Sequence, residues 1–302
     1  MSQAFFRLAP TPSGYLHLGN ALNFGLTWLL ARMHGGELRL RIDDLDAARS
    51  QPEFVEDVFR SLEWLGLDYE EGPSGPGEQE TLFSQRHRLP LYEEAMAKLW
   101  KSGKLFACDC SRKSIRHLSP AGLYSGTCRN RGLSRTQTQV AWRILTPAQQ
   151  PIQWQDLVLG EQSVDLADHM PDFVLRRKDH LPAYQLASLL DDQAYGINFL
   201  VRGADLREST AAQLYVADCL GMDEFRQARF LHHPLLLDER GAKLAKSAGA
   251  ASLLQLRESG QEPSLVFAHL SRWLGLPAIA QGPAELLAIS QQSEFEIGQI
   301  WQ

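Results

Sequence analysis

The amino-terminal part of the chain passes from a short apolar run to a longer helical period. Residues 5–8 are mostly apolar, which predicts a buried strand. The turn-forming residues Pro10, Pro12 and Gly14 then interrupt both strand and helix. Leucines recur at a helical spacing over residues 18–33, which predicts a helix. Such a strand–turn–helix junction directs unpaired backbone N–H groups toward one point, where a phosphate group can bind.

Short apolar runs and helical periods continue to alternate along the rest of the chain. Further strands are expected near residues 38–42, 67–69, 173–175, 186–190, 199–201 and 230–231. Helices are expected near residues 52–64, 86–102, 211–220 and 265–274, with another apolar segment at 253–258. This alternation favours an α/β fold with a parallel sheet wrapped by helices, whose ligands bind at the carboxyl ends of the strands.

Changes in composition divide the chain into four expected parts. Residues 1–105 form the first half of a nucleotide-binding domain. The sequence then becomes polar and rich in Ser, Arg, Thr and Gln, which indicates an inserted subdomain over residues 106–170. Residues 171–235 complete the domain. Residues 236–302 hold a lysine-containing loop and a short helical region.

Charge and hydropathy narrow the classes of function. The formal net charge is −6, from 30 basic and 36 acidic residues, which argues against extensive non-specific binding along a nucleic-acid backbone. No apolar run is long enough to cross a bilayer, and the amino terminus lacks the pattern of a signal peptide. We therefore expect a cytoplasmic monomer that contacts no membrane. Local basic clusters fit a solvated surface as well as a nucleic-acid contact: Arg112, Lys113, Arg116, Arg129, Arg131 and Arg135, and Arg176–Lys178.

Two separate motifs indicate chemistry on a nucleoside triphosphate. His17-Leu-Gly19-Asn20 opens the first predicted helix, where His17 can donate to a phosphoryl oxygen and Gly19 lets a nucleotide ring lie against the backbone. Far along the chain, Lys243-Leu-Ala-Lys246 presents two ammonium groups in a loop. Each motif alone also fits a simple helix start or a solvated basic loop. Their joint presence favours the nucleotide site.

Three of the four cysteines lie in one segment. Cys108, Cys110 and Cys128 can supply three thiolates to one ion, and thiolate-rich tetrahedral sites select zinc. A closed set of protein ligands makes such an ion structural. The alternative is a group of free buried thiols, because cysteine is often found in protein cores. His117 lies between the cysteine pairs and is a chemically suitable fourth ligand.

Taken in order along the chain, these motifs resemble those of the class I aminoacyl-tRNA synthetases. Residues 7–14 resemble the opening of the glutamyl/glutaminyl branch, and Arg41-Ile-Asp43-Asp44-Leu-Asp46 resembles its acidic motif. Its later landmarks resemble residues 184–192, 201–206 and 232–237, the last leading into the lysine loop. The resemblance covers roughly residues 5 to 275. It is strongest to the truncated family of glutamyl-Q tRNA(Asp) synthetases.

This resemblance implies a fold and a reaction. The fold is a Rossmann-like class I catalytic domain with an inserted zinc-binding, acceptor-type subdomain and a short helical C-terminal part. No anticodon-binding domain is expected, because the tail from Pro277 is too short for one. The implied reaction is attack of the glutamate carboxylate on the α-phosphorus of ATP, followed by transfer of the glutamyl group to a tRNA. In this family the acceptor is queuosine of tRNA(Asp).

The resemblance also assigns residues to the ATP side of the site. His17 and the helix that follows it would serve the α-phosphate, with Gly19 and Asn20 completing the ATP site. Lys246, aided by Lys243, would hold the β,γ side. Mg²⁺ would arrive with ATP and be held mainly by its phosphates. The implied catalytic residues are thus His17, Lys243 and Lys246.

The implied glutamate pocket contains residues from four motifs. Arg7 would form a bidentate pair with the side-chain carboxylate of glutamate, a geometry suited to guanidinium. Asp43 would hold the α-ammonium group. The pocket is completed by Ala9, Thr11, Tyr184 and Arg202. In the zinc site, the family pattern places Tyr124 as the fourth ligand beside Cys108, Cys110 and Cys128, with His117 as its rival.

Three positions depart from the family pattern. Asp43 stands where the family has glutamate, so its carboxylate reaches one methylene less far. Asn20 replaces a second histidine of many relatives, and Ala245 replaces the usual serine of the lysine loop. These departures keep two alternatives open: a paralogue that adenylates another amino acid or carboxylate, and a non-catalytic nucleotide-binding paralogue.

Overall fold

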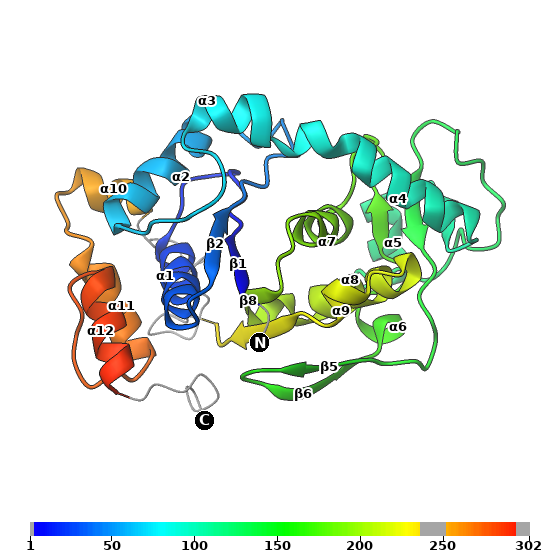
Figure 1. The fold of residues 1–302 in the computed structure, drawn as a ribbon. Coiled ribbons are helices and arrows are strands. Elements are labelled where there is room, and N and C mark those ends of the chain that lie inside the picture. Colours follow the sequence, from blue (N-terminus) through cyan, green and yellow to red (C-terminus); the bar gives the residue numbers. More distant parts are fainter. Residues whose placement is uncertain (1–2, 236–251, 294–302) are drawn as a thin grey trace.

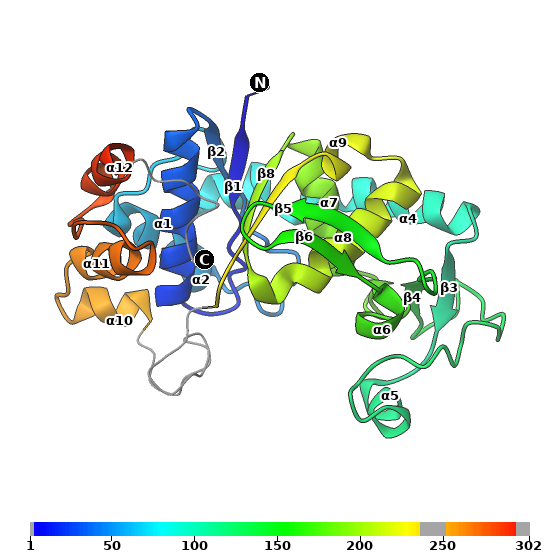
Figure 2. The ribbon, with the colours of Figure 1, turned by 90° about the horizontal axis from the view of Figure 1, so that it is seen from below.

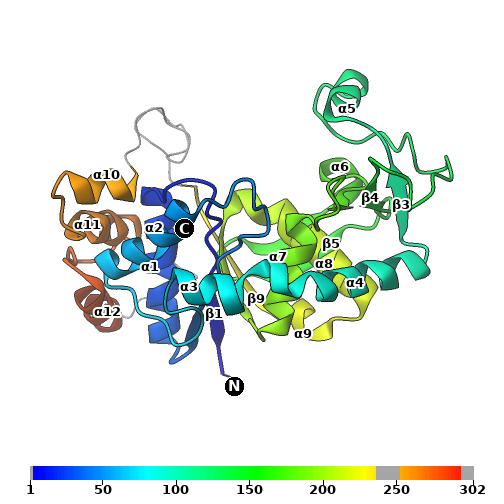
Figure 3. The same cartoon turned by 90° about the horizontal axis from the view of Figure 1, so that it is seen from above.

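A computed structural model describes residues 3–235 and 252–293, and three views show how its elements are arranged (Figures 1, 2 and 3). A parallel layer of strands lies at its centre. β1 (Phe5–Leu8) pairs with β2 (Glu37–Leu40), and β8 (Phe199–Gly203) pairs with β9 (Arg229–His233). β1 and β8 meet at Asn198, whose backbone N–H donates to the carbonyl of Phe5 at 3.1 Å. The expected α/β class with a parallel sheet is confirmed.

The first predicted helix is buried on nearly all sides because it lies between two layers. α1 (Leu18–Met33) packs against β1, β2 and β8 on one side. α11 (Ser264–Trp273) and α12 (Pro283–Gln292) cover its other side (Figure 2). This double contact explains why its apolar residues surround the helix instead of forming one stripe. α2 (Pro52–Leu65) lies nearby and packs against α10 (Leu253–Glu258).

A second apolar core lies on the other side of the parallel strands. It is formed by α4 (Leu89–Lys101), α7 (Tyr184–Ala194), α8 (Arg207–Leu220) and the short α9 (Asp223–Arg226). α3 (Pro76–Glu78) and two irregular helical turns lead into α4, which runs along one face of the molecule toward β3 (Figure 3). Two apolar cores therefore lie on the two sides of the parallel strands. The site was expected at the carboxyl ends of these strands.

The polar segment forms small structures of its own. β3 (Leu105–Cys108), β4 (Ala141–Ile144) and β7 (Val174–Arg176) make an antiparallel sheet, so the strand expected near 173–175 belongs to this sheet. α5 (Arg112–Leu118) extends away from the body of the protein (Figure 2). The expected division into four parts stays a prediction.

The polar segment also contributes to the central layer. The hairpin of β5 (Ile152–Asp156) and β6 (Gly160–Val164) continues that layer beyond β9, through a parallel pairing of β5 with β9. The short α6 (Leu166–His169) follows the hairpin. Asp156, the last residue of β5, is thereby brought next to β9.

Two expected strands were wrong. Residues 186–190 lie inside α7, where both faces of the helix are buried, and a short buried apolar run does not distinguish strand from helix by its periodicity. Residues 67–69 form no strand, although the chain just after them contacts β2 through a hydrogen bond from Leu40 N to Glu71 O at 2.8 Å. Among the described residues, no helix has the length and hydropathy needed to cross a membrane.

Candidate active site

A cavity of about 510 Å³ opens at the carboxyl ends of β1 and β8, beside the start of α1. It brings together residues that are widely separated along the chain. Tyr184, at its rim, is 39% exposed, whereas Arg202 is 2% exposed. Eight residues singled out from the sequence line this cavity: Arg7, Ala9, Thr11, His17, Asn20, Asp43, Tyr184 and Arg202.

His17 and Asn20 form the first turn of α1 at one end of the cavity. The Nδ1 atom of His17 accepts a hydrogen bond from Asn20 N at 3.3 Å, and Asn20 Oδ1 accepts one from His17 N at 3.1 Å. A Cβ atom added at Gly19 would lie 3.0 Å from the imidazole ring. Gly19 therefore leaves room for the ring to fold back over the helix start, a contact that the sequence did not predict.

Lys243, Lys246 and Ala245 lie outside the described residues. The residues before and after that segment contact the cavity side of α1. His233 Nε2 lies 3.0 Å from Asn23 Oδ1, and Leu253 N donates to Leu16 O at 2.7 Å. Ser252 also forms an isolated antiparallel bridge with His17. The described chain on both sides of the lysine segment thus approaches the same helix end.

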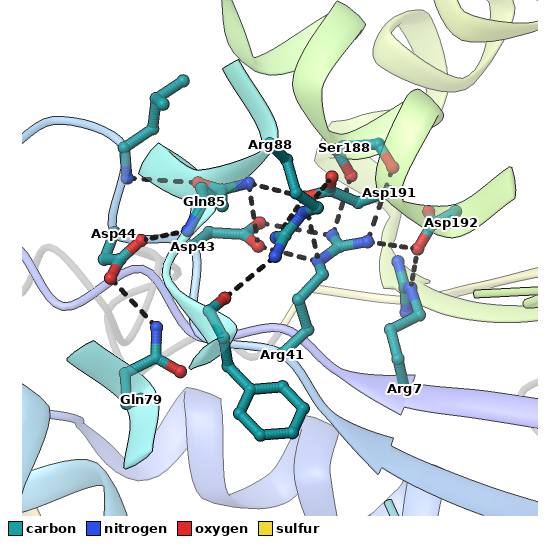
Figure 4. Close-up of polar contacts among 12 residues, drawn as sticks. Arg7, Arg41, Asp43, Asp44, Gln79, Gln85, Arg88, Ser188, Asp191 and Asp192 are labelled. Atoms are coloured by element: carbon teal, nitrogen blue, oxygen red, sulfur yellow. Dashed lines mark hydrogen bonds and ion pairs between the residues drawn. The ribbon is translucent and has the colours of Figure 1, made fainter. Parts of the chain in front are cut away.

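A buried network of charged residues forms the other end of the cavity (Figure 4). Asp192, which is fully buried, pairs with three arginines: Arg41 at 2.6 Å, Arg7 at 3.1 Å and Arg202 at 3.4 Å. Its Oδ1 atom accepts from both Arg7 and Arg41. The sequence motifs gave no role to Arg41 or Asp192. Asp192 follows the apolar run of α7, and a buried charge at such a position indicates a buried partner of opposite charge.

A second carboxylate, Asp191, joins the network from the α4 side. It accepts two hydrogen bonds from Arg88, at 2.8 and 2.9 Å, and one from the Tyr92 hydroxyl at 2.7 Å. In these ion pairs, four guanidinium groups face three carboxylates, so the fully ionised network carries one excess positive charge. The charged residues are Arg7, Arg41, Arg88 and Arg202, and Asp43, Asp191 and Asp192.

Asp43 lies where the network meets the cavity. Arg41 donates to its Oδ1 atom at 2.8 Å and to its Oδ2 atom at 3.3 Å, and Gln85 donates to Oδ1 at 3.4 Å. The pKa of Asp43 is raised to about 6, chiefly by burial; Asp191 and Asp192 add to the rise, and Arg41 opposes it. The carboxylate is thus held in place by a cation and is still only weakly acidic.

A second cavity of about 230 Å³ adjoins the first and shares Thr11, Ser13, Asp43 and Tyr184 with it. Its other polar lining includes Ser50, Asp46 and Arg177. Arg177 pairs with Asp46 at 2.9 Å. The lining therefore combines hydroxyl groups with charge pairs that largely cancel, and it meets the larger cavity at Asp43.

The cysteine segment gathers three sulfur atoms. The Sγ atoms of Cys108, Cys110 and Cys128 all lie within 4.8 Å of one another, with Cys110 and Cys128 separated by 3.5 Å. The Tyr124 hydroxyl accepts a hydrogen bond from Cys128 N at 2.7 Å. His117 is exposed on α5 and does not belong to this group. His117 therefore does not lie beside the three sulfur atoms, whereas the Tyr124 hydroxyl lies next to Cys128.

The sulfur positions fit a tetrahedral zinc ion. With Zn–S bonds of about 2.3 Å, the corners of a tetrahedron lie about 3.8 Å apart, close to the sulfur separations found here. Burial and the two neighbouring thiols raise the pKa of Cys110 to about 12. A metal ion bound here would oppose this effect, because metal binding favours the deprotonated thiolates.

Residues 4–294 match the family described as tRNA synthetases class I (E and Q), catalytic domain. The chain is 39% identical over 284 residues to the glutamyl-Q tRNA(Asp) synthetase of Symbiobacterium thermophilum, covering 89% of this chain and 86% of that protein. It is 38% identical over 288 residues to the protein of the same name from Nitratidesulfovibrio vulgaris, with coverage of 89% and 86%.

Similarity extends to longer synthetases. A glutamate–tRNA ligase of Citrifermentans bemidjiense is 35% identical over 281 residues, which cover 90% of this chain and 57% of the ligase. The crystal structure of a glutamate–tRNA synthetase from Elizabethkingia anophelis matches with a TM-score of 0.79 at 23% identity, covering 99% of this chain and 67% of that one. At this identity the structural match shows the fold.

Proposed function

Because this chain belongs to the catalytic-domain family of the class I tRNA synthetases for glutamate and glutamine, we propose that it activates glutamate with ATP and transfers the glutamyl group to a tRNA. One observation carries this proposal. A single cavity has a helix start with His17 at one end and a cluster of arginines with an excess positive charge at the other. A triphosphate and an acidic amino acid would fit these two ends.

Activation requires the α-carboxylate of glutamate to attack the α-phosphorus of ATP, with pyrophosphate leaving. Arg7 and Arg202 would bind the side-chain carboxylate, since guanidinium groups bind carboxylates in a fixed geometry. Tyr184, Ala9 and Thr11 would close the pocket around it. Fixing the carboxylate at this end aligns the α-carboxylate for attack, which is the main contribution that a protein makes to such a reaction.

Asp43 would hold the α-ammonium group of glutamate. Its two oxygen atoms already accept hydrogen bonds from Arg41, so the carboxylate is oriented before substrate arrives. The shorter side chain leaves a gap relative to the glutamate of the family pattern. Either the substrate lies deeper in the pocket or a water molecule bridges the gap.

The phosphates of ATP would lie against the first turn of α1, close to His17, Gly19 and Asn20. Helix starts favour phosphate groups because backbone N–H groups and the helix dipole point toward them. Lys246, aided by Lys243, would neutralise charge on the β,γ side. Mg²⁺ would accompany ATP and balance part of the phosphate charge.

The second cavity would admit the acceptor. Relatives of which this chain covers 86% are named glutamyl-Q tRNA(Asp) synthetases, which supports queuosine of tRNA(Asp) as the acceptor. The cavity offers hydroxyl groups and a charge pair next to Asp43, a lining suited to a small hydroxylated ring. An acceptor hydroxyl there would approach the activated glutamyl group from the side opposite the phosphates.

Zn²⁺ would be held by Cys108, Cys110, Cys128 and Tyr124. The donor set is closed by protein atoms, so the ion would stabilise the small sheet instead of taking part in the reaction. Metal analysis of the purified protein tests this assignment. About one zinc ion per chain is expected, and a protein purified without metal would contradict it.

Pyrophosphate exchange tests the function directly. The purified protein is incubated with ATP, labelled pyrophosphate and each of the twenty amino acids, without tRNA. Exchange with glutamate is expected. Exchange only with another amino acid would favour the paralogue with a different substrate, and ATP binding without any exchange would favour the non-catalytic alternative. Lys246→Ala should abolish exchange while leaving the fold intact.

A further inference from the structure

Arg202 is held less well by carboxylates than the other arginines of the cavity. Its only ion pair among the described residues is with Asp192, at 3.4 Å. Asp192 also forms ion pairs with Arg7 and Arg41. Within the described part of the chain, its buried Nε atom has no hydrogen-bond partner. Burial lowers the pKa of Arg202. The closest contact of its guanidinium group is the Thr210 hydroxyl, at 2.9 Å from Nη1.

Thr210 is the first member of a chain of buried hydrogen bonds that leads away from the cavity. Its Oγ1 atom lies 2.9 Å from His232 Nε2, and His232 Nδ1 lies 2.6 Å from Asp156 Oδ2. The side chains of His232 and Asp156 are fully buried. The chain therefore connects Arg202 on β8 to β9 and then to the end of β5.

Asp156 fixes the histidine at the far end. Its Oδ1 atom accepts hydrogen bonds from the backbone N–H groups of Val158, Leu159 and His232, at 3.0, 2.9 and 3.3 Å. Burial raises the pKa of Asp156, but the hydrogen bonds from His232 and these backbone groups outweigh it and lower the pKa overall. An ionised carboxylate only accepts, so His232 Nδ1 carries a proton and donates a hydrogen bond to Asp156.

The roles of the Thr210 hydroxyl follow from this arrangement. Arg202 is only a donor, so Thr210 Oγ1 accepts from it. Its single O–H group can donate either to the carbonyl of Leu206, at 3.1 Å, or to His232 Nε2, at 2.9 Å, which accepts when the proton is on Nδ1. The hydroxyl is thus held between Arg202, from which it accepts, and two acceptors that share its one hydrogen, and it in turn sets the direction of the guanidinium group.

From these contacts we infer that Thr210 and His232 are positioning residues for Arg202, and that Asp156 anchors them from the β5–β6 hairpin. The inference rests on the proposed binding of glutamate by Arg202. The excess positive charge of the cavity selects an acidic side chain only if the guanidinium group points at it. The guanidinium group of Arg202 is directed by Thr210, His232 and Asp156, none of which touches the substrate.

The experiment compares variants by pyrophosphate exchange with glutamate. Thr210→Val removes the hydroxyl and keeps the shape, whereas Thr210→Ser keeps the hydroxyl. Thr27→Val is a matched control, because Thr27 is also buried in a helix and also donates to the carbonyl four residues earlier, at 2.7 Å. Each variant is measured for the KM of glutamate, the KM of ATP, kcat and the melting temperature.

Thr210→Val should raise the KM of glutamate roughly tenfold to a hundredfold, the range expected for losing a hydrogen bond to a charged group. The KM of ATP should change less than about twofold, because ATP lies at the other end of the cavity. Thr210→Ser and Thr27→Val should both keep the KM of glutamate. Equal glutamate KM values for Thr210→Val and Thr27→Val would overturn the inference.

Two histidine variants separate positioning from stability. Gln can place its amide oxygen, which accepts as Nε2 does, near the Nε2 position of His232, whereas Asn can replace only the Nδ1 contact to Asp156. His232→Gln should therefore keep the KM of glutamate close to that of the unmodified protein, and His232→Asn should raise it as Thr210→Val does. If both variants lower the melting temperature and neither changes the KM, the role is merely structural. If the unmodified protein shows exchange with glutamate and all variants have the same KM of glutamate, only the inference about Thr210 and His232 is overturned. If the unmodified protein shows no glutamate-dependent exchange, the proposed function is overturned as well.

Discussion

Replacing Asp43 by asparagine should change the pH dependence of both stability and substrate binding. In the folded protein the pKa of Asp43 is raised from 3.8 to about 6, chiefly by burial. At pH values between these two, the folded protein holds a proton that the unfolded chain has lost. Folding is therefore most favoured by this group below pH 4, and that contribution is lost as the pH rises through 6.

The size of the effect follows from the same values. Since each tenfold change corresponds to about 1.4 kcal/mol, ionising Asp43 in place costs about 3 kcal/mol of folding free energy by pH 8. Asparagine cannot ionise, and its amide oxygen can still accept from Arg41. The unfolding free energy of Asp43→Asn, relative to the unmodified protein, should therefore increase by about 3 kcal/mol between pH 4 and pH 8.

Urea unfolding at a series of pH values measures this difference. Asp46→Asn is the matched control, because Asp46 is a carboxylate on the same segment that is paired with Arg177 and more exposed. The KM of glutamate in the unmodified protein should also rise as the pH falls below about 6, since a protonated Asp43 no longer attracts an ammonium group. A stability difference that stays constant from pH 4 to pH 8 would refute the reasoning.

Three further predictions concern single groups. Arg7→Lys should raise the KM of glutamate at least tenfold in pyrophosphate exchange, because an ammonium group cannot form the bidentate pair; an unchanged KM would remove Arg7 from the pocket. Cys110→Ser, or treatment with a chelator, should release zinc and lower the melting temperature, which calorimetry with metal analysis can follow, and a tightly zinc-bound variant would contradict the ligand set. Arg177→Gln should slow glutamyl transfer to tRNA(Asp) by tenfold or more and leave exchange without tRNA unchanged, and equal losses in both assays would place Arg177 in the activation step.

The sequence was sufficient to predict an element where a local pattern of residues determines its structure. The helix over 18–33 and the strand over 5–8 were predicted at the bounds that the structure has. Turn residues and a long apolar period fix both elements without help from distant parts of the chain. The prediction of a strand at 186–190 was wrong because α7 is buried on both faces, so its short apolar run shows no helical stripe.

The lining of the larger cavity was predictable from motif order, but the charges behind it were not. Arg7 and Arg202 lie in recognisable motifs, whereas the carboxylate that joins them, Asp192, is a buried residue of α7. Its partners come from β1, β8 and the segment after β2, so no local spacing reveals them. The hydrogen bonds that link Arg202 to Asp156 through Thr210 and His232 could not be predicted for the same reason, since they cross three strands and a helix.

The shared use of Asp192 makes the arginines of the cavity interdependent in evolution. Losing one of them changes the charge balance felt by the other two, so substitutions at Arg7, Arg41 and Arg202 should show strong epistasis. A lineage that shifts toward a neutral substrate would have to remove an arginine and adjust the remaining partners of Asp192 together. Coordinated substitution of several residues, and not a single substitution, is the accessible route to a new specificity in this protein.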